Sequence, residues 1–232
     1  MGFQQFQVGD KPLTVFDLDD LCDSATGRAL TGAWVWHSAL VLAETMTSHF
    51  RLGQDQFPIF FGKSVIELGA GAGLPGLTAA LLGASRVVLT DVVALLPGLR
   101  KNVEANGLGD RVEVRELVWG SEESLSRIGE FDVVLMSDVF FDAEEMAALG
   151  RTLRTVCRRR GTMIWAATEV RPWTAECLSE LEKEGFGIVE LASGLRSSAE
   201  GNEGMELGSF AVYSLALPDE EDGHVADLGA LS

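Results

Sequence analysis

A glycine-rich segment, residues 65–76, follows a short apolar run and contains Gly69, Gly71 and Gly73, with Glu67 just before them. Glycine lets a backbone turn sharply and pass close to a ligand, because no Cβ stands in the way. The apolar run predicts a buried strand, and the residues after the loop predict a helix. In an open α/β sheet, such a loop lies at the carboxyl end of a strand, where ligands bind. The segment therefore predicts a small-molecule site.

A second chemical group, Asp91, stands at the end of the next predicted strand. An acid at this place can accept hydrogen bonds from both hydroxyls of a ribose through its two carboxylate oxygens. The other interpretation is that Asp91 caps the helix that follows, because aspartate is favoured at helix N-termini. The two roles are compatible, and together with the glycine loop Asp91 indicates a nucleoside ligand.

Two nucleoside cofactors compete for this loop. The frame Gly71-x-Gly73-x-x-Gly76 satisfies the dinucleotide fingerprint, but a lone match is weak. That fingerprint begins directly at the strand end, and counted from Gly69 its last position is Leu74 rather than a glycine. A nicotinamide cofactor is therefore the less favoured of the two.

The frame Glu67-x-Gly69-x-Gly71-x-Gly73 instead resembles the loop of class I methyltransferases, which faces the amino-acid half of S-adenosylmethionine (SAM). A carboxylate near the α-ammonium group of SAM is favourable, whereas a carboxylate near a pyrophosphate is not. We therefore interpret Glu67, the three glycines and Asp91 as SAM-binding residues.

The elements around these residues alternate in type. Apolar runs with alternation predict strands over residues 64–68, 86–90, 111–117, 131–137, 162–168, 187–191 and 209–217. Helical spacing of apolar residues predicts helices over residues 34–50, 75–82, 95–105, 143–157 and 174–184. Strands that alternate with helices indicate right-handed crossovers and a mostly parallel, doubly wound α/β sheet. The last two strands lack a helix between them, which predicts an antiparallel hairpin at one edge.

The same pattern suggests three parts of the chain. Residues 1–33 are interpreted as an N-terminal β-hairpin with an irregular extension, because apolar positions alternate around the turn at residues 9–12. Residues 34–217 form the predicted SAM-dependent methyltransferase domain. Residues 218–232 are acidic and are expected to be disordered.

Four blocks of the sequence, spread over residues 31–217, resemble the seven-β-strand class I protein-lysine methyltransferases that modify non-histone proteins. The blocks are residues 32–43, the glycine loop through Asp91, residues 102–120 with their two asparagines and the Trp119-Gly120 pair, and Ser137-Asp138-Val139-Phe140-Phe141. The blocks occur in the family's order and at its spacing. The resemblance implies a Rossmann-like seven-stranded fold, SAM as methyl donor and a protein substrate.

The resemblance also implies roles for single residues. Trp36 would lie beside the methionine portion of SAM, and Trp119 would pack near the adenine ring, which suits an aromatic face. Ser137 and Asp138 would lie at the end of the fourth strand, over the transferring methyl group, with Phe141 as an aromatic wall. The alternative for each tryptophan is plain core packing.

Two features qualify the resemblance. The family motif at the fourth strand is usually Asp-x-x-Tyr, and here Phe141 takes the last place, so the wall is kept and a hydroxyl is lost. His37 stands where an acidic or polar residue is common. The segment Glu169-x-Arg171 matches a further family segment and is interpreted either as lining the substrate side or as a surface ion pair.

Composition limits the partners. The formal net charge is −17, and five of the acids lie in residues 219–232, so the rest of the chain is also acidic. A nucleic-acid backbone would be repelled at long range, which argues against nucleic acid as partner. The three cysteines and three histidines are too scattered for a metal site, and no apolar stretch reaches the ~18 residues of a membrane span. We expect a monomeric intracellular protein without a bound metal, in the cytoplasm, with the nucleus as a second location.

The favoured interpretation is a SAM-dependent methyltransferase that acts on a protein side chain, lysine before arginine, at a basic site. A small-molecule N- or O-methyltransferase and a catalytically silent SAM-binding interaction protein are the alternatives. An NAD-dependent oxidoreductase is the least favoured. Asp138 would attract and orient the arriving amine, and Phe141 would help to desolvate it.

Overall fold

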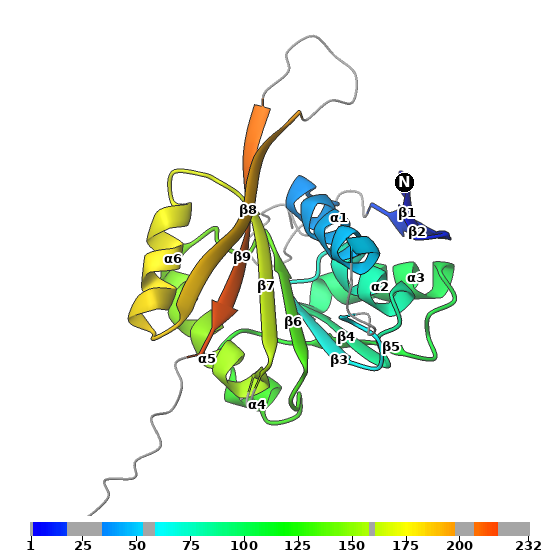
Figure 1. Ribbon diagram of the computed structural model, residues 1–232. Helices are drawn as coiled ribbons and strands as arrows, with labels where there is room; N and C mark the ends of the chain where they lie inside the picture. Colours follow the sequence, from blue (N-terminus) through cyan, green and yellow to red (C-terminus); the bar gives the residue numbers. More distant parts are fainter. Residues whose placement is uncertain (1, 18–33, 53–58, 158–160, 198–206, 218–232) are drawn as a thin grey trace, which may run out of the picture.

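The structure is a computed structural model that describes residues 2–17, 34–52, 59–157, 161–197 and 207–217 (Figure 1). The predicted irregular extension after the hairpin and the predicted disordered tail lie outside these residues. No helix in the described ranges is long and apolar enough to cross a membrane.

A seven-stranded sheet forms the centre of the molecule, and its strand order is β5-β4-β3-β6-β7-β9-β8. The strands are β3 (Ser64–Leu68), β4 (Arg86–Asp91), β5 (Val112–Glu116), β6 (Val133–Ser137), β7 (Met163–Glu169), β8 (Gly187–Ser197) and β9 (Leu207–Ala216). The strands from β3 to β7 run parallel to one another, whereas β9 pairs antiparallel with both β7 and β8. The predicted fold class, including the antiparallel edge pair, is confirmed.

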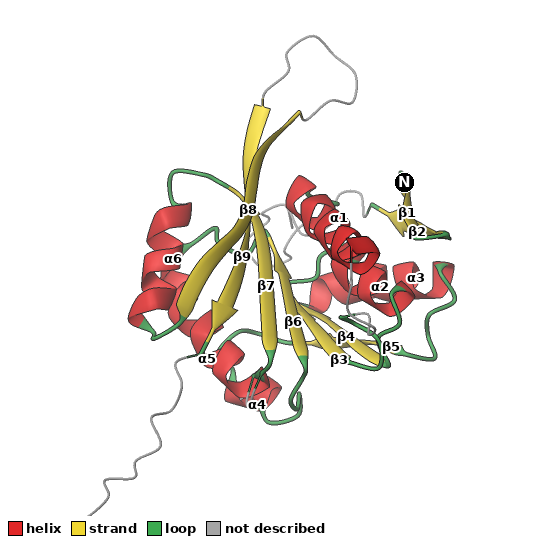
Figure 2. Cartoon of the chain, viewed as in Figure 1, coloured by secondary structure: helices red, strands yellow, loops and turns green. Residues whose placement is uncertain are grey.

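Helices cover both faces of the sheet (Figures 1 and 2). One face carries α1 (His37–Leu52), α2 (Leu74–Leu81) and α3 (Leu96–Ala105), and the other carries α5 (Met146–Val156) and α6 (Thr174–Lys183). The short helix α4 (Glu122–Leu125) lies in the connection between β5 and β6. Two 3-10 turns, η2 (Val93–Leu95) and η3 (Ala143–Glu145), precede α3 and α5.

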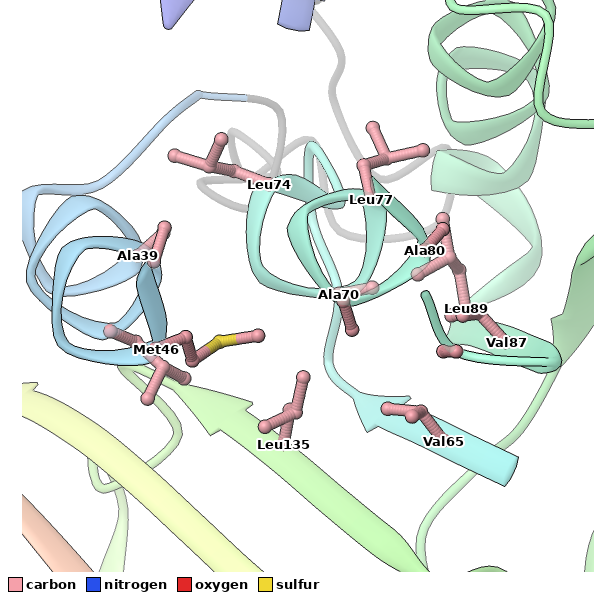
Figure 3. Packing of buried hydrophobic residues seen from close by; sticks show 14 of the residues in the cluster. Ala39, Met46, Val65, Ala70, Leu74, Leu77, Ala80, Val87, Leu89 and Leu135 are labelled. Carbon is pink, nitrogen blue, oxygen red and sulfur yellow. The ribbon is translucent and has the colours of Figure 1, made fainter. Parts of the chain in front are cut away.

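The strands are buried on both faces, and successive side chains enter different cores. Val65 of β3 packs with α1 and α2, whereas Ile66 packs with the helices of the opposite face. Figure 3 shows the first core, where Met46 of α1 lies beside Leu135 of β6 and Val65 of β3 lies beneath α2. Side chains of a strand alternate between faces, so every second residue of β3 belongs to the α2 side. Glu67 is one of them.

Some predicted bounds change. Helix α1 begins at His37 rather than at residue 34, so Trp34 and Trp36 lie in the segment that leads into it. Strand β8 runs to Ser197, six residues beyond its predicted end, because it pairs along the whole of β9. Helix α4 was not predicted: it has four residues, and its apolar content is too small to show helical spacing.

A separate two-stranded hairpin, β1 (Phe3–Val8) with β2 (Lys11–Phe16), confirms the predicted N-terminal hairpin. Its strand β2 is held by two amide side chains, one within α3 and one directly after its end. Asn106 Oδ1 accepts from the Thr14 N–H at 2.8 Å, and Asn102 Oδ1 accepts from the Phe16 N–H at 2.9 Å. The hairpin is thereby attached to the helix that follows β4.

The order of the strands decides where a ligand can lie. The connection after β3 goes to α2 on one face, and the connection after β6 goes to α5 on the other, although these strands are neighbours. Two connections that leave in opposite directions open a crevice at the carboxyl ends of the strands. Gly69, Asp91 and Ser137 all stand at that edge, at or directly after strand ends that lie side by side.

Candidate active site

A cavity of about 880 Å³ lies in this crevice. It is lined by the segment before α1, the glycine loop, the end of β4, and the loops that follow β5, β6 and β7. Its volume is in the range of small-molecule sites. The structure brings nine of the ten residues singled out from the sequence to its wall: Trp36, Gly69, Gly71, Gly73, Asp91, Trp119, Ser137, Asp138 and Phe141.

The glycine loop forms one wall and leaves room only for backbone. Gly69 has φ +63°, a conformation that strains other residues. A Cβ on Gly69 would lie 3.3 Å from Cζ2 of Trp119 and 3.4 Å from Cγ1 of Val139. At Gly73, with φ +83°, a Cβ would lie 2.9 Å from the side chain of Leu99. Both glycines are therefore required, one by the cavity and one by the packing behind it.

Asp91 connects the glycine loop with strand β4. Its Oδ2 accepts a hydrogen bond from the Gly71 N–H at 2.8 Å, and its Oδ1 accepts from the Val92 N–H at 2.7 Å. Burial raises the pKa of Asp91 above its ordinary value, and these two backbone hydrogen bonds partly oppose the shift. A carboxylate offers about four acceptor sites, so acceptor capacity remains for the hydroxyls of a bound sugar.

Glu67 is the exception among the ten residues, and its role in binding the cofactor stays a prediction. Its side chain is fully buried beneath the loop on the α2 side and does not line the cavity. Its Oε2 accepts from the Gly76 N–H at 2.8 Å in the first turn of α2. Because strand alternation directs Glu67 toward α2, its carboxylate supports the loop from below.

Burial raises the pKa of Glu67 well above its ordinary value; the Gly76 hydrogen bond opposes this shift, and the charge of Asp91 adds to it. Its Oε1 has no hydrogen-bond partner among the described residues.

Four aromatic side chains frame the mouth of the cavity. The rings of Trp34 and Trp36 lie 6.3 Å apart, and the rings of Trp119 and Phe141 lie 6.1 Å apart. Phe141 is 52% exposed, so its ring stands at the opening and not in the core. Aromatic faces attract cations as well as flat rings. The mouth is therefore suited to an adenine, a sulfonium or an alkylamine.

Asp138 stands directly after β6 with a backbone φ of 58°, the only positive value of a non-glycine residue in the described chain. Its N–H donates to the Ala167 carbonyl at 2.9 Å. Its carboxylate accepts from Arg171, Nη1 to Oδ1 at 2.9 Å and Nη2 to Oδ2 at 3.2 Å. A strained backbone held by its surroundings is common at functional sites.

The partner of Asp138 comes from the segment after β7. Arg171 Nη2 also donates to Glu169 Oε2 at 2.7 Å, and its guanidinium lies 5.7 Å from the centre of the Trp36 ring. Glu169 and Arg171 form an ion pair, as one of the two interpretations expects, and Arg171 also lines the cavity; whether they line the substrate side stays a prediction. The pairing with Asp138 was missed, because no local pattern shows which side chains meet across two strand ends.

A supporting group was also missed. Nδ2 of Asn102 donates to the Ala72 carbonyl of the glycine loop at 2.9 Å, while the same side chain binds the hairpin residue Phe16. Asp17, after β2, accepts from the Val35 N–H at 3.3 Å, one residue before Trp36. The two asparagines four residues apart on α3 were the available signal, since residues at that spacing share one helix face.

These residues fit SAM as the bound methyl donor. The glycine loop lets a ligand come close to its backbone. A Cβ on Gly69 would lie 3.3 Å from the Trp119 ring at the cavity wall. Asp91 lines the cavity with acceptor capacity for a ribose, and the aromatic faces of Trp36 and Trp119 suit the sulfonium and the adenine. None of the described residues forms a cluster of three or more metal-binding side chains.

Comparisons with known proteins agree with this geometry. Protein N-lysine methyltransferase METTL21A of Mus musculus is 34% identical over 79% of this chain and 82% of its own length. Histone-arginine methyltransferase METTL23 of the same species is 36% identical over 63% of this chain and 57% of its own length.

A solved structure of precorrin-6y C5,15-methyltransferase from Geobacter metallireducens aligns with a TM-score of 0.55 at 18% identity, over 77% of this chain and 88% of that one. This likeness supports the class I methyltransferase fold.

The model of the lysine methyltransferase family matches residues 18–194, which is most of the chain and includes every residue of the cavity wall. SAM is the methyl donor that the family and the fold imply. The chain therefore belongs to the lysine methyltransferase family, and it is a SAM-dependent methyltransferase.

Proposed function

We propose that this protein methylates the ε-amino group of a lysine in a protein substrate. The observation that carries the proposal is the joint wall of one cavity, where the nucleoside-binding residues Gly69 and Asp91 stand beside Asp138 and Phe141. The name of the mouse relative, a protein N-lysine methyltransferase, supports lysine as the target.

The donor side of the cavity binds and orients. We assign Asp91 to the ribose hydroxyls, the loop from Gly69 to Gly73 to the amino-acid half, and Trp119 to the adenine ring. Trp36 lies on the wall beside the same loop and is assigned to the methionine portion. Ser137, at the end of β6, is assigned to the floor between donor and acceptor. A fixed arrangement of this kind supplies much of the rate enhancement of a group transfer.

SAM, when bound, supplies a methyl group on a sulfonium, which is an excellent leaving group. The residues of the chain therefore have to position the lysine amine and keep water away during the transfer, and the lysine ammonium releases one proton to solvent before the transfer. A lysine amine has an ordinary pKa of about 10.4, so it must lose its proton before it can act as a nucleophile. Asp138 orients the amine, and the exclusion of water between Phe141 and Trp36 disfavours its charged form.

The acceptor side is open and acidic, which suits a protein. Phe141 is exposed at the mouth, and Asp142 and Glu145 line the cavity beside it. Acidic side chains at a mouth attract a basic segment. We therefore propose a substrate lysine within a basic surface and a monomeric enzyme. The cytoplasmic location stays a prediction.

The test is labelling with SAM that carries an isotopic methyl group. The purified protein is incubated with the labelled SAM and a cell extract, and labelled protein bands are hydrolysed to amino acids. We expect label in discrete bands, recovered as methyllysine, and much less label with the Asp138→Ala variant. Isothermal titration should show binding of SAM and not of NAD.

Three other results would each contradict the proposal in a different way. Methylarginine in place of methyllysine would place the protein with its histone-arginine methyltransferase relative in activity. Label confined to small molecules would indicate a metabolite methyltransferase. Tight SAM binding without any label in the extract would indicate a SAM-binding interaction protein.

A further inference from the structure

We propose that Arg171 is a specificity-determining residue that makes the site select the neutral amine of the substrate and reject its ammonium form. The inference rests on the proposed function, because it concerns the amine that arrives at Asp138. It assigns to Arg171 a part that neither the family nor the relatives' names describe. Three observations carry it: the pairing of Arg171, its rigidity, and the charges around it.

The first observation is that Arg171 occupies Asp138 on the cavity side. Each oxygen of Asp138 accepts from one nitrogen of the guanidinium, at 2.9 and 3.2 Å. The guanidinium also lies 5.7 Å from the Trp36 ring centre. An ammonium that approached Asp138 would meet a cation already paired with it. A neutral amine would not be repelled, and its lone pair would remain free for the methyl group.

The second observation is that Arg171 is held in place. The backbone N–H of Arg171 donates to Thr174 Oγ1 at 3.0 Å, and its backbone carbonyl accepts from the Thr174 N–H at 3.0 Å. Thr174 is itself buried, at 2% exposure, and its Oγ lies 3.3 Å from the Glu169 carbonyl. A side chain fixed by a turn and by two carboxylates does not swing aside without losing charge-assisted hydrogen bonds.

The third observation is the charge of the cavity wall. Among its described residues Arg171 is the one cation, and the acids are Asp91, Asp138, Asp142 and Glu145. Acids alone would stabilise an ammonium, raise the pKa of the bound lysine and leave it unreactive. A fixed cation at the reacting end lowers that pKa again. The carboxylates of Asp142 and Glu145 at the mouth therefore attract a basic substrate. Arg171 prevents Asp138 from holding the substrate amine as a cation.

Arg171 keeps its charge over the range in which a lysine titrates. Burial by itself lowers the pKa of Arg171, but the hydrogen bonds and charges of Asp138 and Glu169 outweigh it and raise that pKa above its ordinary value. His37 begins α1 and lies against Phe210 of β9, with ring centres 6.1 Å apart. A His37→Asn variant therefore belongs among the controls of any pH experiment at this site.

The probes are n-butylamine, which matches the end of a lysine side chain, and butyltrimethylammonium, which is charged at every pH. Their binding to the full chain in the presence of S-adenosylhomocysteine is measured by calorimetry between pH 7 and pH 10. For the unaltered protein we expect the affinity for n-butylamine to rise with pH, because the neutral form binds. We expect butyltrimethylammonium to bind weakly and without pH dependence.

The decisive variant is Arg171→Met, which keeps an unbranched stem in place of the arginine methylene chain and removes the charged guanidinium. We expect n-butylamine to bind about tenfold more tightly at pH 7, the loss of pH dependence, and tighter binding of butyltrimethylammonium. Arg171→Lys keeps the charge and should retain the pH dependence of the unaltered protein. The His37→Asn variant should retain it as well.

The matched control is Arg154→Met. Arg154 forms the same kind of pair, since its Nη1 donates to Glu184 Oε2 at 2.9 Å and its guanidinium lies 5.4 Å from the Phe186 ring centre. It stands on α5, away from the cavity wall. Amine binding by this variant should equal that of the unaltered protein at every pH. An equal change in both variants would mean a loss of stability only, and it would overturn the inference.

A kinetic measurement adds a second readout. The rate of methyllysine formation by Arg171→Met should be about tenfold lower at neutral pH and should recover only as the pH approaches the raised pKa of the bound amine, above the ordinary value of about 10.4. A rate that is lowered equally at all pH values, or an unchanged pH dependence of n-butylamine binding, would overturn the inference alone. Absence of methyllysine with the unaltered protein would overturn the proposed function. The binding measurements involve no methyl transfer, so they test the inference about Arg171 separately.

Discussion

The carboxyl ends and the amino ends of the parallel strands, called here the carboxyl edge and the amino edge of the sheet, carry chemically similar groups. At the carboxyl edge Asp91 accepts from the backbone N–H of Gly71, and at the amino edge Asp132 accepts from the Ser64 N–H, both at 2.8 Å. Asp132 precedes β6 and also accepts from the Ser64 hydroxyl at 2.7 Å. Each carboxylate thus connects two neighbouring strand ends.

Similar arginine pairs and similar glycines also occur at both places. The Arg171–Asp138 pair at the carboxyl edge has its counterpart in the Arg154–Glu184 pair at the end of α5 and α6, each with an aromatic ring near the guanidinium. Gly69 has φ +63°, and so does Gly107, in the turn that leads to β5. A Cβ on Gly107, however, would meet nothing within 4 Å.

The difference lies in what surrounds these groups. At the carboxyl edge the connections of β3 and β6 leave toward opposite faces and open the cavity, so that Asp91, Arg171 and Gly69 all line it. The counterparts at the amino edge do not line that cavity. Residue type and hydrogen bonding therefore do not identify the site by themselves. The site is identified by the position of these groups beside the point where the strand order reverses.

The largest expected effect separates the two arginine pairs. Asp138→Ala should lower methyl transfer about a hundredfold, because the amine loses its orienting group, while SAM affinity stays nearly unchanged. Glu184→Ala should leave the rate unchanged and lower only the melting temperature. Turnover assays, calorimetry with SAM and thermal unfolding measure the three quantities. A fully active Asp138→Ala variant would remove Asp138 from the catalytic role.

The next effect separates the two aspartates. Asp91→Ala should weaken SAM binding about tenfold or more, because a charged acceptor bonded to a ligand contributes about 1.5–3 kcal/mol. Asp132→Ala removes a similar pair of hydrogen bonds and should lower stability without weakening SAM binding. Calorimetry on both variants decides the comparison. Equal SAM affinities would show that Asp91 has only a structural role.

A smaller effect separates the two glycines with the same backbone angle. Gly69→Ala and Gly107→Ala should each cost about 1 kcal/mol of stability, since an alanine is strained at positive φ. Only Gly69→Ala should weaken SAM binding, by roughly fivefold, which corresponds to about 1 kcal/mol. Its Cβ would push against Trp119 and Val139 at the cavity wall. Similar SAM affinities in the two variants would contradict the assigned cradle.

The smallest effect tests the buried position of Glu67 beneath α2. Because burial raises its pKa in the folded state above the ordinary value of 4.5, Glu67 favours the folded state most below that pH. This contribution is lost as the pH rises through the raised pKa. Glu67→Gln should therefore remove this loss and raise the melting temperature at pH 8 by roughly 2–4 °C, the equivalent of about 1 kcal/mol.

At pH 4 the gain in melting temperature of Glu67→Gln should disappear. SAM affinity should change less than about threefold, because Glu67 does not line the cavity. Thermal unfolding at both pH values and calorimetry with SAM check these expectations. A large loss of SAM affinity would return Glu67 to the cofactor-binding residues.

Much of the fold follows from local patterns in the sequence. Strands such as β6 are short and apolar in all but the last residue because both their faces are buried, and the glycine loop follows β3 because glycine adopts its backbone angles near a ligand without strain. Eight of the ten predicted site residues line one cavity because they lie at or after strand ends, and the carboxyl ends of a parallel sheet meet on one side; Trp36 joins them from the segment before α1.

The tertiary structure decided which of these side chains contact one another. Arg171 and Asp138 are 33 residues apart, and Asn102 meets the hairpin across 86 residues. Such contacts depend on strand order, register and the face to which each crossover goes, and a local pattern holds none of these. The sequence shows that side chains of β3 alternate between two faces. Only the position of α2 shows that Glu67 faces the underside of that helix.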